Sequence, residues 1–441
     1  MTASVAVIGA GWAGCAAAVE LAVAGCKVTL FEAARTLGGR ARAVELDGRK
    51  LDNGQHILLG AYTETLRLLK MSGVDPDSAL LRLPLQMRYP SGCDGMDFVA
   101  PHLPAPLHLL VALLRAQGLT RDDKMALARL STTARWMDWR LNDDCSVTTL
   151  LQRYDQTERL IRLMWQPLCI AALNTPPERA SAQVFLNVLR DSLGARRAAS
   201  DMLIPKTDLS TLFPQHAAGF IEKHGGKIRT GTAVTGIRKA EQGWMLTTAD
   251  NDEAHFDAAV IATHAVQTAS LLAEATGHTA FSDFAYEPIS TCYLQYPAGT
   301  QLAQPFFALL DDPLHDRPGQ FVFDRGQLDA QQNGLFAVVI SASSAAIADG
   351  HAALAQAVAT QLAAAFERPE LAHPEWTRVI TEKRATYSCT PALERPIEQT
   401  EFPDLAIAGD YLAGDYPATL ESAVRSGVKA ARVLQENLSA N

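Results

Sequence analysis

Several features that would assign this 441-residue chain to a common functional class are missing from it. Its seven cysteines are dispersed and include no CxxC pair, a pattern typical of reduced cytoplasmic thiols, so neither a disulfide framework nor a metal site is expected. The net charge of −9 leaves no basic footprint, which disfavours nucleic acid as a partner. No apolar run reaches the roughly 18 residues of a membrane-spanning helix, and the N-terminal stretch has no basic secretory region. We therefore expect a cytoplasmic protein, with any membrane contact confined to the inner face.

The N-terminal residues have the pattern of a β-α-β unit. The apolar run "SVAVI" (4–8) is followed by the glycine turn "GAGWAG" (9–14), an alanine-rich helical stretch, and a second apolar run, "CKVTLF" (26–31). Parallel strands need a crossover of this kind, which is usually a helix. The unit therefore predicts a parallel sheet, and "DLAIAGD" (404–410) with the helix-periodic stretch after it predicts a further strand-turn-helix system.

The glycines of the first turn have the spacing of a dinucleotide-binding motif. Gly9 permits the tight turn, Gly11 lets the backbone approach a pyrophosphate, and Gly14 lets helix and strand pack closely. Glu32, 18 residues after Gly14, can accept hydrogen bonds from both hydroxyls of a ribose. A glycine-lined turn without a ligand is the alternative, but the helix N-terminus behind the turn favours bound phosphate.

A second glycine turn helps to distinguish between the possible dinucleotide cofactors. "ARTLGGRARA" (34–43) supplies Gly38, Gly39 and Arg40, whose N–H groups and guanidinium can reach the same pyrophosphate. Nicotinamide enzymes do not need this second turn. Together with "AGDYLAGDYPATLESAVRSG" (408–427), these motifs resemble those of the flavin-containing amine oxidase and phytoene desaturase superfamily.

The resemblance implies that the cofactor is FAD. In that superfamily a Gly-Asp pair, here Gly409 and Asp410, holds the ribityl and pyrophosphate region, and the helix after it points its N-terminus at the flavin. Val234 in "TAVTGI" is expected to contact the adenine side through its backbone. The implied FAD contacts are Gly9, Gly11, Trp12, Ala13, Gly14, Glu32, Ala33, Gly38, Gly39, Arg40, Gly54, Gln55, His56, Val234, Gly409, Asp410, Ala418, Thr419 and Leu420.

Three further stretches are similar to one branch, the squalene-associated FAD-dependent desaturases, which are hydroxysqualene dehydroxylases. They are "DNGQHILLGAY" (52–62), "WQPLCIAALNTPPERASAQVFLNVL" (165–189) and "SDMLIPKTDLSTLFP" (200–214). Desaturases and amine oxidases usually carry a glycine pair before the "GGKI" strand, where this chain reads "PKTDLS" (205–210). The departure favours the dehydroxylase branch over plain desaturase or amine-oxidase chemistry.

The same resemblance implies an α/β fold with two domains, each assembled from discontinuous segments. A Rossmann-like FAD-binding domain is expected from residues 1–75, 215–269 and 381–441. An amine-oxidase-like α+β substrate-binding domain with a mainly helical lid is expected from residues 76–214 and 270–380.

The implied reaction removes the allylic hydroxyl of hydroxysqualene reductively to give squalene, in squalene and hopanoid biosynthesis. It needs a hydride from reduced flavin and a proton donor for the leaving hydroxyl. The candidate donors are His56, Asp201, Lys206 and Asp208. Each has a structural alternative: a backbone-bonded or flavin-facing histidine for His56, a helix cap or ion pair for the aspartates, and a surface position for Lys206. Tyr416 can border the flavin or serve packing alone.

Two other classes of function remain open at this point. One is an FAD-dependent desaturase or oxidase of a carotenoid-type isoprenoid or an amine, and the other is a flavin-binding regulator or prenyl carrier without catalysis. No second GxGxxG follows a strand, so the electron donor is not identified and is either a diffusing carrier or a separate protein.

Apolar stretches in the insertions suit a polyisoprenoid substrate. "PHLPAPLHLLVALLRAQGL" (101–119) is too short to span a bilayer but could form a helix at the membrane surface, or an ordinary core helix of the lid. "WMDWRL" (136–141) and "LMWQPLCIAAL" (163–173) could line an apolar tunnel, although core packing also explains such runs.

Overall fold

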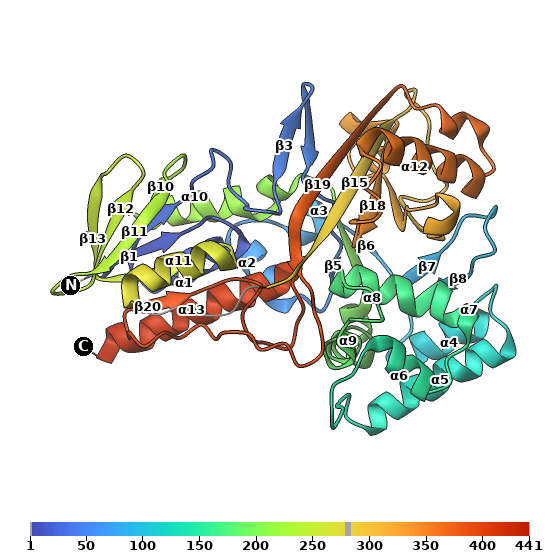
Figure 1. Cartoon of the computed structure of the whole chain (residues 1–441), viewed down its shortest axis with the longest axis horizontal. Helices are drawn as coiled ribbons and strands as arrows, with labels where there is room; N and C mark the ends of the chain where they lie inside the picture. The colour runs from blue at the N-terminus through green and yellow to red at the C-terminus, as the bar shows by residue number, and fades with distance from the viewer. Residues whose placement is uncertain (1, 278–283, 441) are drawn as a thin grey trace.

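The protein is built around a five-stranded parallel sheet, seen in a computed structural model that describes residues 2–277 and 284–440 (Figure 1). Its strand order is β10-β2-β1-β14-β20, so strands from both ends of the chain lie side by side. Apart from Ser4 at the start of β1, the central strands β1 and β14 are apolar, as expected where helices and loops cover both faces of the sheet. The strands are β1 (Ser4–Ile8), β2 (Lys27–Phe31), β10 (Lys227–Arg229), β14 (Ala258–Ile261) and β20 (Leu405–Ile407).

Two helices from opposite ends of the chain pack together on this sheet. Helix α1 (Trp12–Val23) follows β1 and is buried along most of its length, because its alanines let neighbouring backbones approach closely. Helix α13 (Leu420–Ala440) follows β20 and packs along α1. The predicted β-α-β unit and the predicted C-terminal strand-turn-helix system are thus confirmed, and they share one layer.

A small antiparallel sheet extends this half of the molecule. It consists of β11 (Val234–Lys239), β12 (Trp244–Thr248) and β13 (Glu253–Phe256), with α11 (Ala265–Thr276) packed on β11. Helix α10 (His216–Lys223) also packs on α1.

The second half contains a five-stranded antiparallel sheet of order β16-β17-β18-β15-β19. Side chains alternate along it, so that Val338 and Ile340 of β18 pack in a core beneath α12 (His351–Ala365) while Val339 faces a cavity. The strands are β15 (Tyr286–Gln295), β16 (Phe306–Ala308), β17 (Phe321–Asp324), β18 (Leu335–Ser341) and β19 (Trp376–Tyr387).

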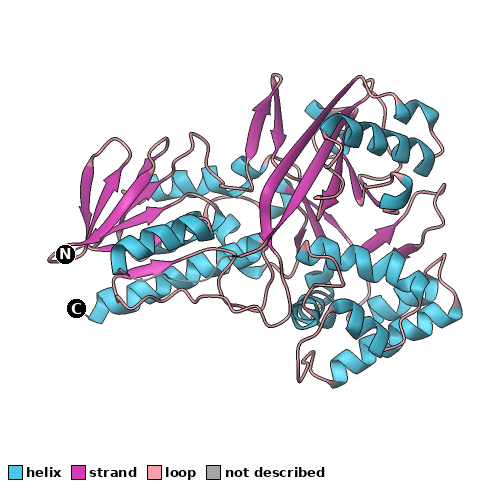
Figure 2. Cartoon of the chain, in the orientation of Figure 1, coloured by secondary structure: helices cyan, strands magenta, loops and turns pink. Residues whose placement is uncertain are grey.

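A helical lobe covers the other side of the cavity, at the lower right of Figure 2. The expected helix over 101–119 is shorter than predicted, since α4 runs only from Leu107 to Arg115. Pro101, Pro104 and Pro106 explain the late start, because proline lacks the N–H that a helix needs. The other helices of the lobe are α5 (Arg121–Trp136), α6 (Val147–Arg153), α7 (Glu158–Leu160), α8 (Gln166–Leu173) and α9 (Ala182–Leu189), with π-helical turns η1 (Ile161–Trp165) and η2 (Arg190–Gly194).

Short elements join the two halves. Strand β9 (Met202–Pro205) pairs with β5 (Leu58–Leu59) and with β6 (Leu80–Leu83). We keep the division into two discontinuous domains as a proposal; the parallel sheet takes all its strands from the three segments assigned to FAD. Among the described residues, the other strands and helices are β3 (Ala43–Leu46), β4 (Arg49–Asp52), α2 (Thr63–Met71), α3 (Pro76–Ala79), β7 (Gln86–Arg88), β8 (Asp97–Val99) and π-helical η4 (Thr211–Gln215). The 3-10 turns there are η3 (Arg197–Ser200), η5 (Pro313–His315), η6 (Arg325–Gln327), η7 (Ala330–Gln332) and η8 (Pro369–Ala372).

Candidate functional site

One cavity of about 850 Å³ extends from the parallel sheet to the antiparallel sheet and the helical lobe. Its polar end is lined by the two glycine turns, by residues 53–56 and 232–235, and by residues near the start of α13. Its other end is lined almost entirely by aliphatic and aromatic side chains. The cavity can therefore hold a ligand with a charged, polar part beside a long apolar one.

The two glycine turns pack against each other at the polar end. The Gly38 N–H donates to the Ala10 carbonyl at 2.9 Å, which fixes the second turn on the first. A methyl group on Gly14 would stand 1.8 Å from the Gly9 carbonyl oxygen, so only glycine fits there. A methyl group on Gly11 would meet nothing nearer than the Gly39 Cα at 3.9 Å, and Gly11 lines the cavity. The open side of Gly11 is thus space that a pyrophosphate can fill, with the N-terminus of α1 behind it.

Glu32 is held by the same turn. Its Oε2 accepts a hydrogen bond from the Ala10 N–H at 2.8 Å, and its Oε1 accepts one from the Ala34 N–H at 2.9 Å. The carboxylate lines the cavity with further acceptor capacity on both oxygens. This arrangement suits a ribose with two free hydroxyls.

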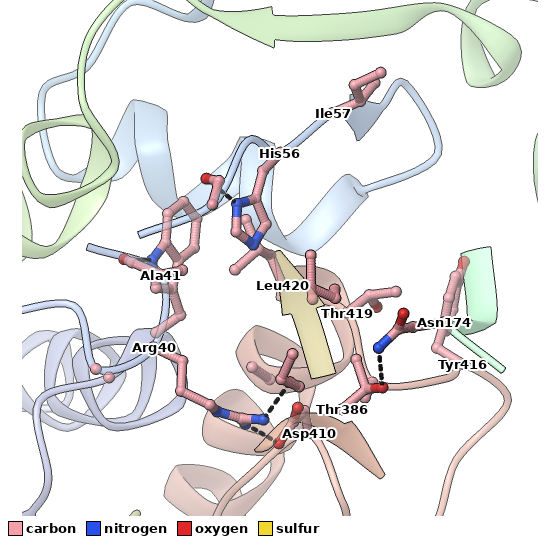
Figure 3. Close-up of a pocket in the computed structure, with 18 of the residues that line it drawn as sticks. Arg40, Ala41, His56, Ile57, Asn174, Thr386, Asp410, Tyr416, Thr419 and Leu420 are labelled. Carbon is pink, nitrogen blue, oxygen red and sulfur yellow. Dashed lines mark hydrogen bonds and ion pairs between the residues drawn. The ribbon is translucent and has the colours of Figure 1, made fainter. Parts of the chain in front are cut away.

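Arg40 and Asp410, 370 residues apart, form an ion pair at 2.6 Å in the cavity wall (Figure 3). Arg40 Nη1 also donates to the Ala385 carbonyl at 2.7 Å. Burial opposes the charge of Arg40, but the Asp410 carboxylate outweighs it and raises the pKa of the guanidinium. The pair joins the second glycine turn to the Gly-Asp motif before α13, the arrangement that two motifs holding one dinucleotide require.

The predicted FAD contacts converge on this end of the cavity, with one exception. Gly14 does not line the cavity, because it lies beneath the turn against Gly9. The predicted residues that line it are Gly9, Gly11, Trp12, Ala13, Glu32, Ala33, Gly38, Gly39, Arg40, Gly54, Gln55, His56, Val234, Gly409, Asp410, Ala418, Thr419 and Leu420.

His56 lies in the cavity wall near Thr419 and Leu420 (Figure 3). Its Nδ1 is 3.0 Å from the Gly54 carbonyl oxygen, and because a carbonyl only accepts, Nδ1 carries the proton. Burial lowers the pKa of His56, and Arg40 lowers it further. The neutral ring therefore offers Nε2 as a hydrogen-bond acceptor. This suits a supporting contact and not the donation of a proton.

Three of the candidate proton donors must be corrected, because they lie outside the cavity lining. Asp208 accepts from the Thr211 N–H at 3.0 Å and pairs with Lys50 at 2.6 Å. Burial alone would raise the pKa of Asp208, but these partners lower it, so the carboxylate caps a helix start and has no proton to give.

The other two corrections have similar causes. Asp201 is buried and paired with Arg82 at 2.9 Å and with Arg197 at 3.2 Å, so it serves as an ion-pair anchor behind the wall. Lys206 donates its backbone N–H to the Ala79 carbonyl at 2.9 Å, and its side chain does not line the cavity. Asp201, Lys206 and Asp208 are therefore not placed to donate a proton to a ligand in the cavity.

Sequence reasoning singled out Tyr416, which lines the cavity, but overlooked its polar partner in the wall, Asp191. Tyr416 Oη donates to Asp191 Oδ2 at 2.7 Å, and Arg190 Nε donates to Asp191 Oδ1 at 2.7 Å. The Arg425 guanidinium lies 4.6 Å from the centre of the Tyr416 ring. Burial and Asp191 raise the pKa of Tyr416; burial opposes the charge of Asp191, but Arg190 and Tyr416 lower its pKa. Asp191 carried no sequence signal, because its place in the wall depends on the π-helical turn η2.

The apolar end is lined by strand β8, by the antiparallel sheet and by the helical lobe. Of the two predicted tunnel stretches, 163–173 contributes Met164, Leu168, Ala171 and Ala172, whereas 136–141 contributes nothing to the lining. The phenylalanines at this end are Phe98, Phe185, Phe306, Phe321 and Phe323.

Comparisons with known proteins agree with this geometry. A family model described as "Flavin containing amine oxidoreductase" matches residues 12–435. The chain is 29% identical to the hydroxysqualene dehydroxylase of Rhodopseudomonas palustris over 98% of both chains. It is 25% identical to the zeta-carotene desaturase of Synechocystis over 98% of this chain and 97% of that relative. Cyclohexylamine oxidase from Brevibacterium oxydans superposes with a TM-score of 0.67 over 100% of both chains at 18% identity, which confirms the predicted amine-oxidase-like fold.

Proposed function

The chain belongs to the flavin-containing amine oxidoreductase family and is an FAD-dependent oxidoreductase, and from that premise we propose that it removes the allylic hydroxyl of hydroxysqualene reductively to give squalene. The observation that carries the proposal is one continuous cavity, in which the polar dinucleotide end continues into an apolar end. A triterpenoid alcohol is apolar along its length with one hydroxyl to place. Full-length relatives named hydroxysqualene dehydroxylase support the same choice.

In the proposed reaction the allylic carbon–oxygen bond breaks, oxygen leaves as water, and a hydride replaces it on carbon. When bound, reduced FAD supplies that hydride. The apolar wall holds the hydrocarbon chain and excludes water from the reacting carbon. The remaining requirement is one proton for the departing hydroxide.

We place the proton donor at Tyr416. Its phenol lines the cavity three residues before Thr419, and a phenol is a stronger acid than water, so it can protonate a departing hydroxide. In the resting site the phenol donates its proton to Asp191 through a 2.7 Å hydrogen bond, and the hydroxyl turns from Asp191 to the departing oxygen when it acts as the acid. The Arg425 guanidinium against the ring stabilises the phenolate that remains. His56, neutral with Nε2 as an acceptor, helps to position bound groups.

The oxidative half-reaction, in which the substrate reoxidises the reduced flavin, tests the proposal. Purified holoenzyme is reduced with dithionite without oxygen, mixed with hydroxysqualene, and followed by flavin absorbance while extracts are analysed by mass spectrometry. We expect the flavin to reoxidise as squalene forms in equal amount. Flavin that stays reduced with hydroxysqualene would contradict the proposal.

The second candidate function is desaturation of a carotenoid-type isoprenoid, because a zeta-carotene desaturase also matches over nearly the full length. Desaturation runs in the opposite direction, so oxidised enzyme would be bleached by the isoprenoid. Bleaching by a carotene precursor or by an amine, with no reaction of the reduced enzyme, would favour this second class.

A further inference from the structure

Exposed leucines gather on helix α4 and the segment before it. Leu103 is 36% exposed, Leu107 48%, Leu110 51% and Leu114 66%. We call these four residues the leucine patch. Three of them lie at spacings of three and four along α4 and so share one face of the helix, while His108 and Ala112 are buried on the other. A helix with solvent on one side normally has polar residues there, so an aliphatic outer face indicates a partner.

The neighbouring helix α5 lies alongside the patch. Lys124 Nζ donates to the Leu114 carbonyl at 3.0 Å, which ties the start of α5 to the end of α4. Helix α5 adds two more exposed apolar side chains, Met125 at 65% and Trp136 at 86%. Figure 1 shows both helices at the outer edge of the helical lobe, far from the two chain termini.

The charge around the leucine patch is opposite in sign to that of the whole protein. Residues 107–136 contain five basic and two acidic residues, whereas the chain carries a net charge of −9. Of the two acidic residues, Asp123 is buried and accepts from Thr120 at the start of α5. Arg115, Arg121 and Arg135 form no ion pair with any residue in 2–277 or 284–440. The exposed charge beside the patch is therefore positive.

The patch is also close to the apolar end of the cavity. Strand β8 leads directly into the segment of the patch and packs against α4, and Phe98 at its centre lines the cavity. One layer of structure thus separates the exposed leucines from the space for an apolar ligand.

We propose that the leucine patch is a docking surface for a membrane that contains anionic lipids. Aliphatic side chains with a tryptophan and a cationic border match the composition of helices that lie in the membrane interface. A second copy of this chain fits less well, because a symmetric contact would bring the two positive borders together. No described helix is long and apolar enough to cross a bilayer, so the contact is with its surface. The proposal is independent of which substrate the enzyme uses.

Vesicle sedimentation of the holoenzyme tests this surface. The probes are vesicles of phosphatidylcholine alone and of phosphatidylcholine mixed with phosphatidylglycerol. We expect binding to the mixed vesicles that weakens with added salt, because salt screens the charge attraction. The double variant Leu110→Glu/Leu114→Glu should bind at least about tenfold more weakly, since it places two charges where the proposed contact would bury exposed leucine side chains in the membrane. Ile397→Glu is the matched control, because Ile397 is 55% exposed but lies outside the patch.

Three outcomes would overturn the proposal. The first is no binding of the wild-type holoenzyme to either vesicle, and the second is equal loss in the patch variant and in Ile397→Glu. The third is a wild-type dimer in light scattering that the patch variant turns into a monomer, which would identify a second copy as the occupant. Retained flavin absorbance in the variants shows that each is folded, because the FAD contacts come from both ends of the chain.

Discussion

Tyr416 and Asp191 meet in the cavity wall from two parts of the chain that are 225 residues apart. The pair is surrounded by Arg190 and Arg425, so a negative charge on either partner is stabilised in an otherwise apolar wall. When the phenol gives up its proton, the two guanidinium groups offset the repulsion between the phenolate and the Asp191 carboxylate.

Replacing Tyr416 by phenylalanine should leave FAD bound but slow the enzyme. Because general acid catalysis contributes about 10²- to 10⁴-fold, we expect kcat for the proposed reaction to fall at least about 10²-fold. The measurement is single-turnover flavin reoxidation with hydroxysqualene. Tyr296→Phe is the control, since that hydroxyl donates to the Leu371 carbonyl in a separate core. A Tyr416→Phe enzyme as fast as wild type would show that the proton comes from elsewhere.

Asp52 is a buried carboxyl just outside the cavity, at the start of the "DNGQH" stretch. Its Oδ1 accepts from the Leu209 N–H at 2.9 Å, and burial raises its pKa to about 7 from 3.8. Between these two pH values, the folded protein therefore keeps a proton on Asp52 that the unfolded chain has lost. Stability from this residue is present below about pH 4 and is lost as the pH rises through 7.

Asp52→Asn should remove this pH dependence, because the amide keeps the acceptor oxygen and cannot ionise. We expect the variant to be more stable than wild type at pH 8, by ~2–4 kcal/mol from the size of the shift, and no more stable at pH 4. Urea unfolding at both pH values measures the difference. An equal effect at the two pH values would mean that Asp52 is ionised in the folded protein.

At the scale of elements, the first glycine turn contains one glycine that the fold requires and one that cofactor binding requires. Gly14 leaves no room for a side chain, whereas Gly11 has an open side toward the cavity. The two positions look alike in sequence, but they should respond differently to the same substitution.

Gly14→Ala should destabilise the protein by about 3 kcal/mol or more, because the methyl group overlaps the Gly9 carbonyl. Gly11→Ala should fold with a near-normal melting temperature but bind FAD at least about tenfold more weakly, since its methyl group occupies the pyrophosphate space. Thermal melting of the apoproteins and FAD titration separate the two effects. Weak FAD binding with a low melting temperature in both variants would refute this distinction.

The elements that the sequence predicts well are those determined by local backbone demands. Glycines at 9, 11, 14, 38 and 39, the acidic residue after β2 and the Gly-Asp pair before α13 form turns whose chemistry is contained within a few residues. The pair of Asp191 with Tyr416, the proposed proton donor, could not be predicted in this way. Asp208 forms a local cap with Thr211, whereas Asp191 reaches the cavity only through a π-helical turn and a loop from near the C-terminus. Which polar group faces a cavity depends on the tertiary structure and cannot be read from a few neighbouring residues.

At the scale of the whole molecule, the FAD end of the cavity is formed by segments from the start, the middle and the end of the chain. Gly11, Val234 and Asp410 line it together, and the Arg40–Asp410 pair ties the second glycine turn to the Gly-Asp motif. A dinucleotide bound there touches all three segments at once. It therefore binds the native arrangement and not the unfolded chain.

The melting temperature should accordingly depend on the concentration of FAD. At free FAD one hundred times its dissociation constant, linkage gives about 2.7 kcal/mol of added stability, and each further tenfold adds about 1.4. Calorimetry of apoprotein with increasing FAD measures this, with Gly11→Ala as the control in which the rise should need at least about tenfold more FAD. Limited proteolysis of the apoprotein and holoprotein adds a local measure, because the segment between Arg384 and Leu420 is held to the rest of the molecule partly through Asp410. A melting temperature that does not change with FAD would mean that FAD does not bind the native protein in preference to the unfolded chain.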